Sequence, residues 1–368
     1  MRKNLIFIFL LSLAFSLFSL VKNGDKPQKG NWDFKPEKVW SVDQAGNDLL
    51  TRVGRIRVDS NENVYVMEVK QGKIYVLDKK GKYLYSIGKR GEGPGEYKMA
   101  YNFYICGDFV IVPEMQRIHF FKKDGKFIKT YIEKSPMFPR GFIDENRMIY
   151  VKSDREGMGK DPEKVNVFNF KTEKNRTLLT VSPEKAITAQ KGGMRIVIKD
   201  SQTTPGIILS IAKNEILIGK SDKYEIKKID LNGKELMRFS LTGRSRKHIS
   251  EKFKRKRFES MSLNGGKMPK NMIDLMVKNM PDTSTFFNRI ITDRFGKIYV
   301  FISDLENKSG QEIDVFSPKG KYLYHSNINI ENYSIKSGIV LKKGFLYLFG
   351  EDEYGEGALI KFRVKIPE

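Results

Sequence analysis

A short pattern recurs along the chain and constrains the fold more than any other feature of the sequence. In its clearest copies an Asp precedes a polar turn, and a strand of a β-branched residue, Tyr and Val ends seven residues after that Asp. These copies are Val58–Val66, Ile143–Val151 and Thr292–Val300. Weaker copies of the strand are Phe109–Val112, Ile216–Gly219 and Phe345–Leu348. A supersecondary unit repeated in this way indicates a repeat architecture.

A second element follows most copies: a strand, a polar turn that ends in Gly-Lys, and another strand. The Gly-Lys pairs begin at Gly81, Gly125, Gly233 and Gly320, and the third unit has a turn without Gly at Glu173–Asn175. Polar turns between alternating apolar strands are hairpin signals. Each unit therefore predicts about four short antiparallel strands.

Units of about four strands, repeated roughly every 40–50 residues, are typical of β-propeller blades. Six units fit residues 37–366, and the domain is predicted to be an all-β, six-bladed propeller over 37–368. The last unit has only three strands of its own, and Lys38–Val42 can supply the fourth and close the ring. Closure removes exposed sheet edges. A β-sandwich or a β-helix is the alternative, and the even spacing favours the propeller.

The segment Ile87–Tyr97 reads IGKRGEGPGEY and is the most distinctive string in the chain. It resembles the loop after the first blade of bacterial six-bladed propellers related to the NHL-repeat and TolB-like types. That resemblance implies an architecture and little chemistry. The loop offers four candidate ligand-binding residues, with the two glutamates as acceptors for a cation or sugar hydroxyls: Arg90, Glu92, Glu96 and Tyr97. A shaped connector between blades is the alternative interpretation.

The N-terminus has the pattern of a targeting segment. Arg2 and Lys3 precede an uncharged apolar run, Leu5–Val21. This layout is typical of a secretory signal peptide. Residues 1–24 are predicted to be a signal peptide or an uncleaved N-terminal anchor, and 25–36 a linker. The protein is therefore expected to be exported to the periplasm, the cell envelope or the extracellular space.

Residues 242–285 lack strand alternation. Apolar residues recur at helical spacing from Met272 to Met280, between Pro269 and Pro281, which predicts a helical insertion between blades four and five. A basic stretch before them is a candidate polyanion-binding site: Arg244, Arg246, Lys247, Lys254, Arg255 and Arg257. Its ligand would be an anionic surface such as lipid headgroups or acidic polysaccharide, since export disfavours nucleic acid. A solvated basic face is the alternative, because the whole chain carries a net charge of +23.

The residue inventory excludes several kinds of site. One Cys and three scattered His rule out a disulfide framework and a Cys-based zinc cluster. The repeated residues Asp59, Asp144 and Asp293 stand at equivalent positions, and we expect each to accept hydrogen bonds from the backbone of its own turn rather than to bind Ca²⁺. The sequence therefore assigns no catalytic residue and no metal ligand.

These observations favour an exported, non-catalytic propeller that is a rigid binding platform for a protein, a peptide or a glycan, without a cofactor. The alternative is a calcium-dependent, lactonase-like hydrolase or lyase with its metal on the propeller axis. The expected inner strands near Ile56–Val58 and Ile290–Thr292 are apolar or basic, which disfavours a central cation.

Overall fold

The computed structural model describes residues 20–366 apart from short gaps at 115, 134–136, 153–161, 183–186, 192–193, 199–201, 213, 264–265 and 308–309. Most of the predicted targeting segment, residues 1–19, lies outside the described residues. None of the helices in the described part of the chain is both long and apolar enough to cross a membrane.

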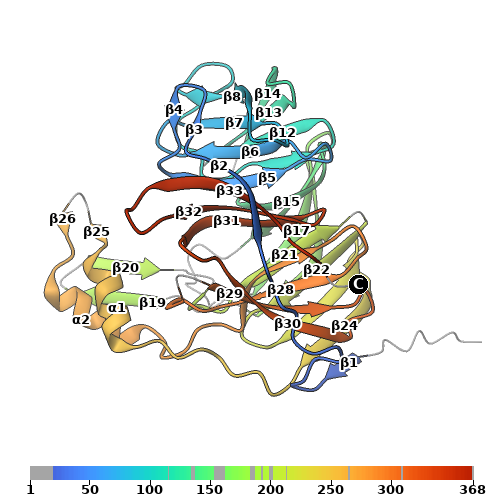
Figure 1. Ribbon diagram of the computed structural model, residues 1–368, viewed down its shortest axis with the longest axis vertical. Coiled ribbons are helices and arrows are strands. Elements are labelled where there is room, and N and C mark those ends of the chain that lie inside the picture. The colour runs from blue at the N-terminus through green and yellow to red at the C-terminus, as the bar shows by residue number, and fades with distance from the viewer. Residues whose placement is uncertain are drawn as a thin grey trace, which may run out of the picture.

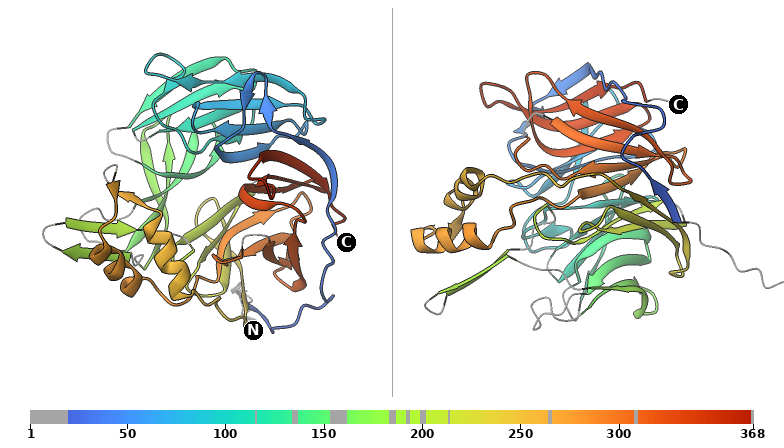
Figure 2. Two further views of the ribbon diagram at one scale, coloured as in Figure 1. Left: turned by 60° about the vertical axis from the view of Figure 1, so that its left-hand side comes forward. Right: turned by 90° about the horizontal axis from the view of Figure 1, so that it is seen from below.

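Six antiparallel sheets, each built on four strands, surround a common axis in the described chain (Figures 1 and 2). The first blade contains β5 (Val53–Val58), β6 (Val64–Glu68), β7 (Lys73–Leu77) and β8 (Tyr83–Ile87). The second contains β11 (Tyr104–Cys106), β12 (Phe109–Pro113), β13 (Arg117–Lys122) and β14 (Phe127–Ile132). The third contains β15 (Pro139–Asp144), β16 (Arg147–Lys152), β17 (Glu163–Asn169) and β18 (Lys174–Val181).

The remaining three blades complete the ring. The fourth contains β21 (Ile207–Ala212), β22 (Glu215–Lys220), β23 (Glu225–Asp230) and β24 (Glu235–Leu241). The fifth contains β27 (Phe287–Thr292), β28 (Ile298–Ile302), β29 (Gly310–Phe316) and β30 (Tyr322–Asn329). The sixth contains β31 (Ser334–Lys342), β32 (Phe345–Glu351), β33 (Gly357–Arg363) and β2 (Glu37–Val42). In this last blade β2 pairs antiparallel with β33, with Ser41 opposite Ile360.

The core is divided into apolar layers between neighbouring blades. The second strand of the first blade, β6, is buried at every position, as is β28 in the fifth. Strands covered on both faces are continuous apolar runs rather than alternating ones, which is why the repeated β-branched-Tyr-Val strands are so uniform.

The Asp at each clear repeat closes its turn: the carboxylates of Asp59, Asp144 and Asp293 each accept a hydrogen bond from the backbone N–H two residues on. This confirms the predicted structural role of these three residues.

The chain before the propeller is also ordered against it. Strand β1 (Leu20–Asn23) pairs parallel with β24 and adds a fifth strand to the fourth blade. The Asn23 side chain is buried and donates to the carbonyls of Ser240 and Gly320, and its oxygen accepts from the Tyr322 N–H. The sequence predicts a linker over 25–36. In the structure this segment runs alongside β30, to which it is joined by backbone hydrogen bonds, and its Trp32 side chain is buried.

A small subdomain projects from one face of the propeller. Helices α1 (Glu251–Glu259) and α2 (Lys270–Asn279) lie between β24 and β27 in the chain. Beside them lies a hairpin of β19 (Ile187–Lys191) and β20 (Met194–Ile198) (Figure 1). Apolar side chains from α1, α2 and β19 form a separate core. Three short strand pairs complete the described elements: β3 (Gln44–Ala45) with β4 (Asp48–Leu49), β9 (Lys89–Arg90) with β10 (Glu96–Tyr97), and β25 (Ser262–Leu263) with β26 (Gly266–Lys267).

The topology fixes which loops share a face. A blade of four antiparallel strands starts and ends on the same side, so every connector between blades lies where the inner strands begin. We call this side the connector face, formed by the described residues within 43–52, 88–103, 133–138, 182–206, 242–286 and 330–333. The helices and the β19–β20 hairpin project from it (Figure 2).

Candidate functional site: a cationic axial cavity

A cavity of about 590 Å³ runs along the propeller axis. All six inner strands line it: β5, β11, β15, β21, β27 and β31. Its volume falls within the range of small-molecule binding sites, about 300–1,000 Å³. The cavity is therefore large enough to hold a compact ligand.

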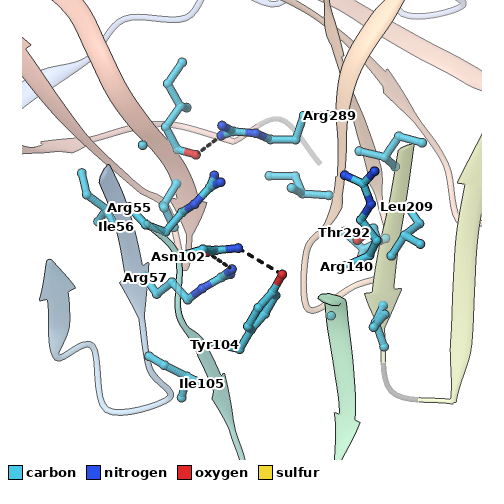
Figure 3. Close-up of a pocket in the computed structure, with 18 of the residues that line it drawn as sticks. Arg55, Ile56, Arg57, Asn102, Tyr104, Ile105, Arg140, Leu209, Arg289 and Thr292 are labelled. Carbon is cyan, nitrogen blue, oxygen red and sulfur yellow. Dashed lines mark hydrogen bonds between the residues drawn. The ribbon is translucent and has the colours of Figure 1, made fainter. Parts of the chain in front are cut away.

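Every charged residue in the described lining is basic: Arg55, Arg57, Arg140, Arg289 and Lys342. None of the five forms an ion pair with a carboxylate of the described residues. Figure 3 shows the four arginines converging on the cavity from three of the six inner strands. Buried or partly buried charges are normally paired, so a cluster of cations without anions is unusual and points to an anionic ligand.

Period-two alternation in the inner strands explains how the sequence produces this lining. In β5 the alternate residues Ile56 and Val58 pack into the layer shared with the sixth blade. Arg55 and Arg57 therefore occupy the opposite face, toward the second blade. In β27 a bulge between Phe287 and Arg289 lets Phe287 and Ile290, three residues apart, both pack in the layer shared with the fourth blade. These basic positions were visible in the sequence as departures from an apolar strand, but sequence reasoning did not assign a site to them.

Arg57 is held by a network that spans three blades. Its guanidinium donates to the Phe103 carbonyl and to Asn102 Oδ1, and it lies 4.7 Å from the centre of the Tyr104 ring. Asn102 in turn donates to the Tyr104 hydroxyl (3.0 Å), and that hydroxyl donates to the Pro139 carbonyl (2.8 Å). This network fixes the guanidinium in place but leaves its charge uncompensated.

Arg289 lies on the other side of the cavity. It donates to the Ile339 carbonyl at 2.5 Å and packs over the Phe301 ring at 5.3 Å. Burial, and to a smaller extent the positive charges of Arg55 and Arg57, lower the pKa of Arg289 to about 10. Burial likewise lowers the pKa of Arg57 to about 10, against a smaller opposing effect of Tyr104. Both groups stay charged at neutral pH, so the unliganded protein holds these charges at a cost.

Of the three arginines Arg55, Arg57 and Arg289, Arg55 is held by the fewest hydrogen bonds. Its Nε is buried without a hydrogen-bond partner among the described atoms. Lys342, at the end of β31, donates to the Val58 carbonyl, and burial lowers its pKa. Donors of this kind, fixed in a partly dehydrated cavity, suit an oxyanion that accepts several charge-assisted hydrogen bonds.

The four residues predicted to bind ligand in the Gly-rich loop do not line this cavity. Glu96 accepts from the Gly93 N–H (2.9 Å) and pairs with Lys89 (3.0 Å), while Glu92 pairs with Lys98 (2.8 Å). Tyr97 is fully buried in the layer between the first two blades, and Arg90 is exposed. The loop thus satisfies its own carboxylates, and its role in ligand binding stays a prediction.

The predicted polyanion-binding residues are largely engaged with neighbouring groups. Arg244 pairs with Asp314, Lys247 with Glu312, Lys254 with Asp282 and Arg255 with Asp274. Arg246 donates to the Asp222 carbonyl and packs over Phe286, and Arg257 lies in the last turn of α1. Four of the six charges are therefore already paired with acids.

Metal and thiol chemistry have little support at the cavity. Among the described residues no group of three or more His, Cys, Asp or Glu could hold a metal ion. The calcium-dependent alternative places a cation on the axis, where the arginines would repel it. Burial raises the pKa of the Cys106 thiol to about 11, so it is protonated at neutral pH.

Comparisons with known proteins support the architecture. The DUF5128 family, described as a 6-bladed beta-propeller, matches residues 46–312. No curated protein matches the chain in sequence. A Bacteroides fragilis protein that is described as exported is 13% identical with a TM-score of 0.53, over 95% of this chain and 100% of its own. A DUF4221 family member from Bacteroides vulgatus is 12% identical with a TM-score of 0.57, over 94% and 99%. A gluconolactonase from Xanthomonas campestris is 10% identical with a TM-score of 0.46, over 90% and 90%. Identities this low show the fold alone, and the third similarity carries no argument about activity.

Proposed function

Because the chain belongs to the DUF5128 family of six-bladed β-propellers and its axis is lined by cations, we propose that it is an exported, non-catalytic binding protein. Its axial cavity takes up an anionic group of the ligand. The observation that carries the proposal is the set of five basic residues in a lining without a described carboxylate.

The energetics favour an anion strongly. Two opposite charges about 4 Å apart attract by about 4 kcal/mol at an effective dielectric constant of about 20. An oxyanion between Arg55, Arg57 and Arg289 would also relieve their mutual repulsion, which the lowered pKa of Arg289 reflects. Arginine binds carboxylate, sulfate and phosphate oxygens in a two-pronged geometry that lysine cannot match. Recognition therefore rests on the arginines, with Lys342 as a further point charge.

Export is supported by the apolar run Leu5–Val21 and by the similar Bacteroides fragilis protein, which is described as exported. A relation to the NHL-repeat or TolB-like types stays a prediction of the resemblance in the Gly-rich loop. A calcium-dependent hydrolase would hold its cation chiefly with carboxylates, and the lining has Asn102 and Asn288 but no described Asp or Glu beside its basic residues.

Calorimetric titration of residues 20–368, which contain every described element, tests this function. Sulfate, citrate and acetate are titrated in a buffer of low ionic strength. We expect saturable binding that weakens as salt is added, and an affinity at least about tenfold lower in Arg289→Met. Arg238→Met is the matched control, because Arg238 pairs with Glu225 and Glu235 in the fourth blade, outside the cavity lining. The absence of binding, or equal binding by Arg289→Met, would refute the proposal.

A further inference from the structure

Two exposed aromatic residues lie in connectors of the connector face, next in the chain to residues that line the cationic cavity. Tyr101 is 53% exposed and directly precedes Asn102, which lines the cavity. Phe138 is 63% exposed and directly precedes Pro139, which lines it as well. The inner strands that follow them, β11 and β15, belong to neighbouring blades and are joined by the hydrogen bond from Tyr104 to Pro139. Two exposed aromatic residues thus each directly precede a residue of the cavity lining.

The backbone of Tyr101 lies beside the start of β5, the strand that carries Arg55, and its hydroxyl donates to Met99 Sδ. Its carbonyl lies 3.2 Å from the position that a Cβ on Gly54 would take, and Gly54 directly precedes Arg55. Aromatic side chains are common in the walls of ligand sites. Tyr101 and Phe138 are therefore candidates for contact with a ligand that extends beyond the cavity toward the connector face.

The lining also contains polar side chains that are not engaged elsewhere. Ser210 on β21 and Asn288 and Thr292 on β27 form no side-chain hydrogen bond with any described residue. Each offers both a donor and an acceptor. A ligand that carries hydroxyl groups as well as an anionic group would satisfy them, whereas a simple inorganic anion would not.

We propose that the ligand is an acidic saccharide, a sugar that carries a carboxylate or a sulfate. The charged group binds Arg55, Arg57 and Arg289, and the ring hydroxyls bond to the free polar side chains of the lining. The apolar C–H face of the next sugar ring packs on Tyr101 and Phe138. This inference rests on the proposed function, since it names the ligand class for the same cavity. An acidic peptide would use the arginines but has no need of so many small hydroxyl and amide partners.

The test compares ligands that differ in one property each. Residues 20–368 are titrated calorimetrically with trigalacturonate, a sulfated heparin disaccharide, neutral cellobiose, triglutamate peptide and inorganic sulfate. We expect one of the two acidic saccharides to bind at least about tenfold more tightly than the cellobiose, the peptide and the sulfate, and the stronger of the two identifies the acid group.

Variants of the cavity surroundings distinguish saccharide recognition from the proposed binding of an anionic group. Tyr101→Ala combined with Phe138→Ala should weaken saccharide binding about tenfold and leave inorganic sulfate binding unchanged. Tyr354→Ala is the matched control, since Tyr354 is 83% exposed in the turn between β32 and β33. Sulfate binding without a preference for saccharide, tighter peptide binding, or an unaffected double variant would refute the saccharide and leave the proposed function standing. If neither sulfate nor any organic anion binds, the proposed function fails as well.

Discussion

Arg289→Met offers a test in which function and stability should move in opposite directions. The arginine is partly buried in the cavity wall, and its pKa is lowered from 12.5 to about 10, chiefly by desolvation. Each unit of pKa corresponds to about 1.4 kcal/mol, so the folded protein carries a penalty of about 3 kcal/mol for this charge. The penalty is fully present below pH 10 and decreases only as the pH rises further. Methionine removes the charge and keeps an apolar contact with Phe301.

The substitution also removes one hydrogen bond, the donation to the Ile339 carbonyl, which is worth about 1 kcal/mol. The net expectation is a stabilisation of about 1–2 kcal/mol in the absence of ligand. Urea unfolding of residues 20–368, followed by circular dichroism in a buffer without multivalent anions, measures it. Arg238→Met should instead be neutral or slightly destabilising, because it breaks the pairs with Glu235 and Glu225.

The reasoning is wrong if Arg289→Met loses 1 kcal/mol or more of stability without ligand. Such a loss would mean that the arginine supports the ring of blades, and the unpaired charges would no longer indicate a ligand. A gain in stability together with lost anion affinity is the signature of a residue kept for binding at the expense of the fold.

Four further predictions concern the scaffold and the cation alternative. Asn23→Ala should lower the free energy of unfolding by about 2–4 kcal/mol in urea titrations of residues 20–368, because three buried hydrogen bonds are lost; an unchanged midpoint would mean that β1 is dispensable. Burial raises the pKa of Glu133 from 4.5 to about 7, so its ionisation destabilises the fold as the pH rises from 4.5 through 7. Glu133→Gln should match the parent near pH 4.5 and exceed it by about 1–3 kcal/mol at pH 8, and equal stability at both pH values would contradict this. Gly88→Ala should cost about 2–4 kcal/mol by thermal unfolding, since φ is 67° and the new Cβ would lie 2.5 Å from the Tyr97 ring; a loss under 1 kcal/mol would count against it. Added Ca²⁺ should leave the melting temperature of EDTA-treated protein unchanged, and a rise of several degrees would favour the calcium-dependent alternative.

The propeller architecture could be predicted from the sequence because the repeats mark its strands and turns. The β-branched-Tyr-Val strands and the Asp turns report burial between blades and hairpin geometry, and both act over a few residues. Strand β1 could not be foreseen, because Leu20 and Val21 belong to an apolar run whose composition indicates targeting. The β19–β20 hairpin was missed since it packs on α2, far away in the sequence.

The cavity was only partly accessible to sequence reasoning. The basic character of the strand around Arg57 was visible in the sequence, where it was an argument against a cation at the axis, a prediction that remains to be tested. Its meaning as a site depends on bringing Arg289 from a distant blade beside Arg55, which no local pattern encodes. The Gly-rich loop was more conspicuous, yet its distinctiveness follows from turn geometry: Gly91 leaves room for the Glu96 carboxylate, which binds the loop's own backbone.

Strand β1 has a consequence for the proposed export of the protein. The apolar run ends at Val21 and the strand begins at Leu20, so the two overlap by two residues. A peptidase that cut after Asn23 would remove the strand and the three hydrogen bonds that join blades four and five, whereas a cut before Leu20 would leave both intact. Without a cut, the membrane anchor would continue directly into β1 at the outer edge of the fourth blade. So short a connection would restrict the rotation of the propeller relative to the membrane. The position of one peptide bond thus decides between a diffusing receptor and a surface-bound one with a restricted orientation.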